Sequence, residues 1–130
     1  MEKYILFIDK DPRMSELLSH SLGKAFRIMW YRSAEAVSQN PENKTYPDVI
    51  ITSYENYTNC RPSYQQIIKY SGKEKLPIIL INTRNNSSSD IPTPEIECIL
   101  GNSVNSTELS LKVLEIVKKY DLETYKIEKH

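Results

Sequence analysis

Short apolar runs alternate along the chain with segments in which apolar residues recur every three or four positions. Five runs have the length of one strand: YILFID (4–9), FRIMWY (26–31), VIIT (49–52), LPIILIN (76–82) and IECIL (96–100). The run at 76–82 is the most apolar and predicts a central strand buried on both faces. Because helical segments separate most of these runs, the sequence predicts an α/β fold with a five-stranded parallel sheet.

The first half of the chain carries clear helix start signals. Asp11, followed by Pro12, predicts the N-cap of a first helix with proline at its first position. The apolar face of that helix is formed by Met14, Leu17, Leu18, Leu22 and Ala25. Ser33 predicts the start of a short second helix that ends near Gln39.

Two further helices are predicted in the second half. Pro62 favours the start of one, which ends near Gly72. Asn105 with Glu108 three residues later is typical of a capped N-terminus, and it predicts a last helix that ends near Tyr120. The apolar face of this helix is formed by Leu109, Val113, Ile116, Val117 and Tyr120.

The alternation of strands and helices is interrupted once. Residues 83–95 (TRNNSSSDIPTPE) contain two prolines and three serines, so a loop is predicted where a fourth helix would be expected. The length of 130 residues suits one domain, which we assign to residues 1–120. Residues 121–130 are predicted to be a polar tail or the start of a linker.

Composition narrows the class of protein. Hydrophobic residues make up 39% and charged residues 26%, which predicts a soluble globular protein. The 17 basic and 17 acidic residues balance, so we expect no direct nucleic-acid partner. The apolar runs are too short to span a bilayer, and the N-terminus lacks a signal-peptide pattern. Cys60 and Cys98 have no metal-type spacing, so a cytoplasmic location with free thiols is expected.

The carboxyl ends of the predicted strands define the candidate site. Open parallel sheets bind ligands at the edge where these ends meet. The segments expected there are Asp9-Lys10-Asp11, Ser53-Tyr54-Glu55, Asn82-Thr83 and Asn102-Ser103.

Four segments of the chain resemble the receiver domain of bacterial two-component response regulators. They are ILFIDKDPRMSELL, YPDVIITS, LPIILINT and NSVNSTEL, and the resemblance covers about residues 3–120. It implies a flavodoxin-like, CheY-like (βα)5 three-layer sandwich. In that family an acidic pair ends the first strand, a phospho-accepting aspartate ends the third, Thr or Ser ends the fourth, and Lys-Pro follows the fifth.

The chain departs from the family pattern at most of these positions. With Pro47-Asp48 aligned, the phospho-acceptor position falls on Ser53. No aspartate occurs between Val49 and Ser89, so no shift of register supplies one. The switch position falls on Asn82, and the family lysine falls on Asn102. The resemblance therefore implies a degenerate pseudo-receiver.

The acidic pair is also incomplete, since it falls on Asp9 and Lys10. Phosphoryl transfer needs an anionic nucleophile, a divalent cation and a fixed positive charge. Ser53 has no aligned base, and Asn102 carries no charge. At about 4 Å and an effective dielectric near 20, Lys10 would repel each unit of charge on a cation by about 4 kcal/mol. We therefore expect neither catalytic residues nor a magnesium cofactor, and we do not expect an enzyme.

Structural roles explain the same residues. Lys10 is expected to pair with Asp9 or Asp11, and the hydroxyl of Ser53 to be satisfied locally. A weak cation site formed by Asp9, Asp11 and Glu55 remains open as an alternative.

The leading functional hypothesis is a phosphorylation-independent protein-interaction module in a two-component, phosphorelay context. Its expected partner is a histidine kinase, an effector domain or a second copy of the chain. Leu111 and Leu114 lie off the main apolar face of the last helix, where they form either a partner or homodimer contact or ordinary helix surface. Two alternatives remain: a small-ligand or nucleotide sensor that uses the crevice, and a weak residual phospho-acceptor. The chain has only three glycines and no glycine-rich phosphate loop, which argues against the sensor.

Overall fold

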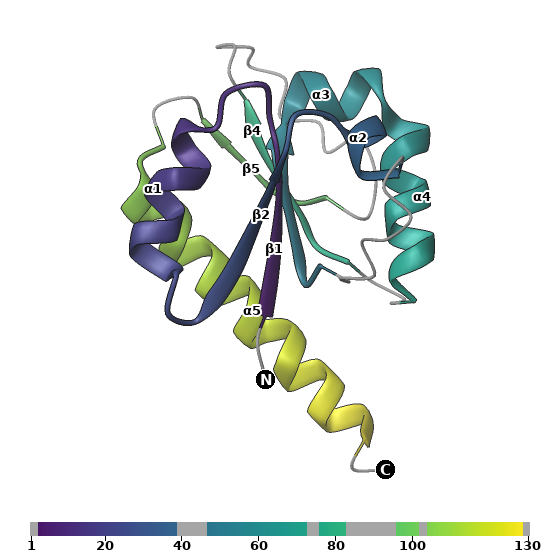
Figure 1. Ribbon diagram of the computed structural model, residues 1–130. Coiled ribbons are helices and arrows are strands. Elements are labelled where there is room, and N and C mark those ends of the chain that lie inside the picture. Colours follow the sequence, from purple (N-terminus) through teal and green to yellow (C-terminus); the bar gives the residue numbers. More distant parts are fainter. Residues whose placement is uncertain (1–2, 39–46, 73–75, 83–95, 102–103, 129–130) are drawn as a thin grey trace.

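The computed structural model describes residues 3–38, 47–72, 76–82, 96–101 and 104–128, and it contains a five-stranded sheet between two layers of helices (Figure 1). The strands are β1 (Lys3–Ile8), β2 (Phe26–Tyr31), β3 (Val49–Ser53), β4 (Ile78–Asn82) and β5 (Ile96–Gly101). Their spatial order is β2-β1-β3-β4-β5, and every neighbouring pair is parallel. The predicted fold class and all five strands are confirmed.

The helices cover both faces of the sheet (Figure 1). They are α1 (Arg13–Leu22), α2 (Ala34–Ser38), α3 (Tyr54–Asn59), α4 (Arg61–Ser71) and α5 (Ser106–Glu128). Side chains of α1 and α5 pack on one face, and those of α2, α3 and α4 pack on the other. Residues 83–95, where the sequence predicts a loop in place of a helix, lie outside the described residues.

Strand β3 is buried along its whole length, and its side chains divide between the two faces. Val49 and Ile51 join the core under α1 and α5, whereas Ile50 joins the core under α2, α3 and α4. Burial of one such aliphatic side chain contributes about 1.5–3 kcal/mol to the stability of the fold. Because β3 contributes such side chains to both cores, it holds both helix layers on one sheet.

The register between β1 and β3 is fixed by the turn that precedes β3. The carboxylate of Asp48 accepts a hydrogen bond from the backbone N–H of Tyr4 at 2.8 Å. The backbone N–H of Asp48 donates to the carbonyl of Tyr4, also at 2.8 Å. Two bonds between the same residues oppose a slip, which would move every side chain of the strand to the other face.

The predicted caps of the second and last helices are confirmed. The backbone N–H of Ala36 donates to the hydroxyl of Ser33 at 3.2 Å. Asn105 and Glu108 bond reciprocally: the Glu108 N–H donates to Asn105 Oδ1 at 2.8 Å, and Asn105 Nδ2 donates to Glu108 Oε1 at 3.2 Å.

The last helix is longer than predicted, because α5 continues past Tyr120 to Glu128. A polar cluster anchors it where it leaves the sheet. Glu97 on β5 accepts from Lys119 at 2.9 Å and from Tyr120 at 2.8 Å, and Lys3 pairs with Asp121 at 2.7 Å. Burial raises the pKa of Glu97, but the bonds from Lys119 and Tyr120 outweigh it and leave the pKa below its usual range.

Beyond this anchor the end of α5 projects away from the sheet (Figure 1). No helix among the described segments is both long and apolar enough to cross a bilayer.

One glycine at the end of a helix permits a direct test of backbone strain. Gly72 ends α4 with φ 71°, and its N–H donates to the carbonyl of Lys69 at 3.3 Å. A Cβ at this position would meet no atom within 4 Å, so only the left-handed backbone disfavours a side chain. We expect Gly72→Ala to lower the free energy of unfolding by about 1 kcal/mol in urea titrations. Gly72→Asn should lower it less, because asparagine tolerates this conformation; equal losses would contradict the explanation.

Candidate functional site

The sheet register brings the predicted site segments to one edge. Ile8 of β1 pairs with Thr52 of β3, so the residues that follow them, Asp9 and Ser53, lie side by side. Ser53 pairs with Ile81, and Asn82 pairs with Gly101. The predicted convergence is confirmed for Asp9, Ser53 and Asn82, and Gly101 marks the end of β5 beside them. Thr83, Asn102 and Ser103 lie outside the described residues.

Ser53, at the position that aligns with the family's phospho-acceptor, is the N-cap of helix α3. Its backbone is extended, with φ −80° and ψ 152°, and its Oγ accepts a hydrogen bond from the N–H of Asn56 at 3.1 Å. The residue is only 8% exposed. The predicted local satisfaction of the hydroxyl is therefore confirmed, and the hydroxyl is engaged in a structural bond.

Helix α3 itself was not predicted from the sequence. It is only six residues long and ends at Cys60, whose φ of −133° separates it from α4. The available signal was Ser53 as a cap, followed by Glu55 in the first turn. Glu55 is half-buried there.

Asp11 has a different partner from the one expected. The carboxylate accepts from Arg13 Nε at 2.8 Å and from the backbone N–H of Arg13 at 3.0 Å. These bonds, the side-chain one first, hold the pKa of Asp11 below its usual range. The predicted N-cap position is wrong by one residue, since Pro12 occupies it, whereas the predicted bond from a backbone N–H at the start of the helix to Asp11 is confirmed.

Lys10 is exposed, and within the described ranges no ion pair joins it to Asp9 or Asp11. The expected charge pairing inside the crevice is therefore wrong. Arg13, two residues beyond Asp11 in the first turn of α1, takes that place: its guanidinium lies 2.6 Å from the Asp11 carboxylate.

The described residues do not fit the magnesium site that the receiver resemblance implies. Divalent cations of this kind need several oxygen ligands converging on one point. Among the parts of the chain that the structure describes, no group of three or more His, Cys, Asp or Glu side chains could hold a metal ion. Asp9, Asp11 and Glu55 all belong to those parts, and together they form no such group.

A buried hydroxyl pair lies directly behind Ser53. The Oγ1 of Thr52 and the phenol of Tyr64 on α4 are 2.7 Å apart, and the ring of Tyr57 lies 5.3 Å from that of Tyr64. Burial, in the first place, raises the pKa of Tyr64 far above its usual value, although the bond to Thr52 lowers it; the charge of Asp9 adds to the increase. The phenol therefore stays neutral and cannot act as a base for Ser53.

Sequence reasoning missed this pair. Tyr64 follows Pro62 in the helix predicted to end near Gly72, and nothing in the sequence indicates that its hydroxyl reaches β3. The guanidinium of Arg61 lies 5.9 Å from the centre of the Tyr57 ring and covers the cluster from outside.

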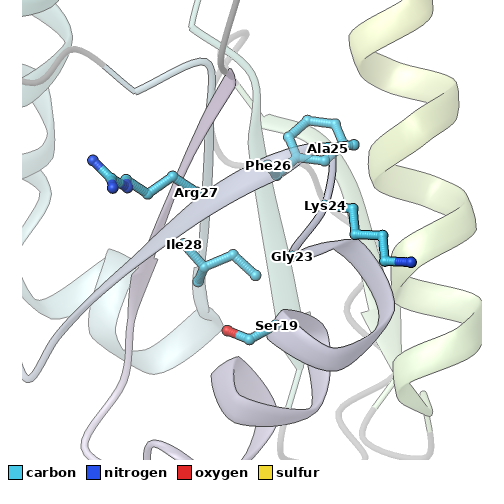
Figure 2. Close-up of a pocket in the computed structure, with 7 residues that line it drawn as sticks. All are labelled: Ser19, Gly23, Lys24, Ala25, Phe26, Arg27 and Ile28. Carbon is cyan, nitrogen blue, oxygen red and sulfur yellow. The ribbon is translucent and has the colours of Figure 1, made fainter.

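A shallow pocket of about 330 Å³ lies at the opposite end of the sheet, where α1 ends and β2 begins (Figure 2). It is lined by Ser19, Gly23, Lys24, Ala25, Phe26, Arg27 and Ile28. Figure 2 shows the charged groups of Lys24 and Arg27 pointing away from each other, so they do not converge on a ligand. This pocket is remote from the carboxyl edge and gives no support to a ligand site there.

The cap at Ser53 can be tested by substitution. We expect Ser53→Ala to lower the free energy of unfolding by about 1 kcal/mol, because the Asn56 N–H loses its acceptor. Ser53→Asp should retain most of the stability, since aspartate is an equally good cap. Urea titrations of both variants measure the difference, and an alanine variant as stable as the aspartate variant would refute the cap.

The buried hydroxyl pair predicts a strong coupling. Tyr64→Phe and Thr52→Val should each cost about 1–3 kcal/mol, because each leaves one buried hydroxyl without its partner. The double variant should lose clearly less than the sum of the two, since no orphan group remains. A double-mutant cycle measured by urea titration tests this coupling. If the loss of stability in the double variant equals the sum of the two single losses, the bond is disproved.

Comparison with known proteins supports the fold. No family model matches the sequence, and no curated protein matches it. A response regulator from Thermotoga maritima is similar in structure, with 10% identity, a TM-score of 0.72, and coverage of 91% of this chain and 99% of that one. The activated N-terminal receiver domain of RstA from Klebsiella pneumoniae is 18% identical, with a TM-score of 0.63 and coverage of 88% and 98%.

A third similar structure is the N-terminal domain of a response regulator, sensory box and GGDEF three-domain protein from Carboxydothermus hydrogenoformans. It shares 18% identity at a TM-score of 0.60, and the match covers 98% of this chain and all of that one. Sheet order, helix layers and these similarities agree, and the chain therefore has the fold of the response regulator receiver domain.

Proposed function

We propose that this chain is a receiver-fold protein-interaction module in two-component signalling, and that its output does not depend on aspartyl phosphorylation. One observation carries the proposal: the hydroxyl at the acceptor position accepts the Asn56 N–H and caps a helix. An acceptor must instead present an anionic oxygen to the phosphoryl group. Ser53 would first have to lose its proton.

The surroundings of Ser53 support the same conclusion. The carboxylate of Asp11 is engaged by Arg13, and the described carboxylates form no cation-holding group. The neutral Thr52–Tyr64 pair offers no base. Each requirement of phosphoryl transfer, namely nucleophile, cation and base, is therefore met poorly at this edge.

A module of this kind acts through surfaces that are present at all times. Its partner would be a protein: a histidine kinase, an effector domain or a second copy of the chain. The similar structure from Carboxydothermus hydrogenoformans is one domain of a three-domain protein, which supports a role in combination with other domains. Under this proposal the module acts in the cytoplasm, and it needs neither a cofactor nor catalysis.

The proposal is tested with a small-molecule phosphodonor. The 130-residue chain is incubated with acetyl phosphate and Mg²⁺, and its intact mass is recorded over time. We expect the mass to remain unchanged, because no anionic acceptor is available at position 53. A receiver domain with an intact acceptor aspartate, treated in parallel, should gain one phosphoryl group.

Ser53→Ala identifies the site if an adduct does form. A phosphoryl adduct on the parent chain that disappears in this variant would overturn the proposal. An adduct that persists in the variant would also overturn it if peptide mapping placed it at the carboxyl edge, on Asp9 or Asp11.

A further inference from the structure

Strand β2 is an outer strand of the sheet, and one of its edges has no neighbour among the described strands. It comes first in the spatial order, and of these strands only β1 pairs with it. The pairing runs without a register shift from Phe26 to Tyr31, and these six residues include no proline and no glycine. Outer strands usually carry such interruptions, which hinder pairing with another chain. The free edge of β2 is therefore regular enough to accept a further strand.

The backbone groups that face this free edge include those of Ile28 and Trp30. Successive residues of a strand direct their N–H and C=O groups to opposite sides. The carbonyl of Tyr31 accepts from the N–H of Asp9 at 3.1 Å, so Tyr31 and every second residue before it face β1. Ile28 and Trp30 alternate with those residues, and their N–H and C=O groups point outward. Outward backbone groups of this kind bind an extended segment by adding it to the sheet.

The side chains at this edge offer an apolar surface on the face of the sheet that α1 covers. Ile28 packs against the core under α1 and borders the pocket of about 330 Å³ between the end of α1 and the start of β2 (Figure 2). Trp30 lies on the same face, two residues further along, and is 39% exposed. In an added strand, the side chain beside Ile28 would reach this pocket, and the next one on that face would cover Trp30.

The opposite face of β2 carries a cation. Arg27 is exposed, and Figure 2 shows its side chain on the other side of the strand from Ile28. Arg32, which is also exposed, follows the strand directly. Among the described residues no ion pair engages either guanidinium. Since β2 contains no acidic residue, a second copy of the strand would bring four arginines together without a counter-charge, whereas an acidic segment would supply one.

We propose that the free edge of β2 binds an extended segment of a partner protein in which apolar and acidic residues alternate. The apolar residues lie beside Ile28 and Trp30, and the acidic residues lie on the face of Arg27, because residues directly opposite each other in a sheet share a face. Backbone hydrogen bonds to Ile28 and Trp30 hold the segment in place. The inference rests on the proposed function, since it names the chemistry of one partner of such a module, but it does not involve Ser53.

Fluorescence anisotropy with a labelled synthetic peptide of about ten residues, in which Glu and Val alternate, tests the binding. We expect the peptide to bind the 130-residue chain saturably. A peptide of the same composition with the order Glu-Glu-Val-Val keeps the charge but not the alternation, and it should bind at least about tenfold more weakly. Absence of binding by the alternating peptide, or equal binding by the paired one, overturns the proposal. Single-stranded DNA that binds equally well would indicate a general polyanion site and would also overturn it.

Charge reversal on β2 tests the contact with the acidic residues. Arg27→Glu should weaken binding of the alternating peptide about tenfold, because it places a like charge beside the glutamates. Lys24→Glu is the matched control: Lys24 is exposed next to β2, but its charged group points away from Arg27 (Figure 2), so this variant should bind normally. Equal losses in the two variants would contradict a specific contact. Circular dichroism confirms that each variant is folded.

Amide hydrogen exchange, followed for each residue by NMR, tests the backbone pairing. In the free chain the N–H groups of Ile28 and Trp30 should exchange faster than that of Met29, which faces β1, and the alternating peptide should slow both. Peptide binding that leaves both amides unprotected refutes strand addition. A dimer of the free chain that protects the same amides, detected by sedimentation velocity, would replace the partner segment with a second copy. A phosphoryl adduct at Ser53 overturns the proposed function alone, and unprotected amides overturn this inference alone.

Discussion

The complete burial of β3 is the constraint on which the rest of the structure depends. A strand with side chains buried on both faces needs a layer of helices on each, and α1 with α5, and α2 with α3 and α4, provide them. The strand must also end where its polar groups find partners. Thr52 bonds Tyr64, and Ser53 caps α3 immediately afterwards. The hydroxyls of Thr52 and Ser53 at the carboxyl edge are therefore engaged in hydrogen bonds that satisfy the polar groups at the end of a buried strand.

This edge differs in kind from an ionic reaction centre. An ionic centre holds mutually repelling carboxylates together, which is costly without a cation and makes the site responsive to one. Here the Asp11 charge is balanced locally by Arg13, and the Thr52–Tyr64 pair behind Ser53 is neutral.

The sequence predicts the fold well because hydrophobic periodicity reports which face of each element is buried. All five strands were recovered, as were the caps at Ser33 and Asn105, since these are set by neighbouring residues. The site was recovered only in part. The meeting of Asp9 and Ser53 follows from parallel topology, but the Thr52–Tyr64 bond depends on where α4 rests on the sheet. The partner of Asp11 was missed because Lys10 and Arg13 are both within reach, and side-chain direction rather than sequence distance decides between them.

The anchor formed by Glu97, Lys119 and Tyr120 has a mechanical consequence. It holds α5 against the edge strand just before the helix leaves the body of the protein, so any tilt of the helix turns about this point. Seven residues beyond Asp121 extend the helix by about 10 Å at 1.5 Å per residue. Because displacement grows with distance from the point of rotation, the tip of α5 is the part that such a tilt would displace most.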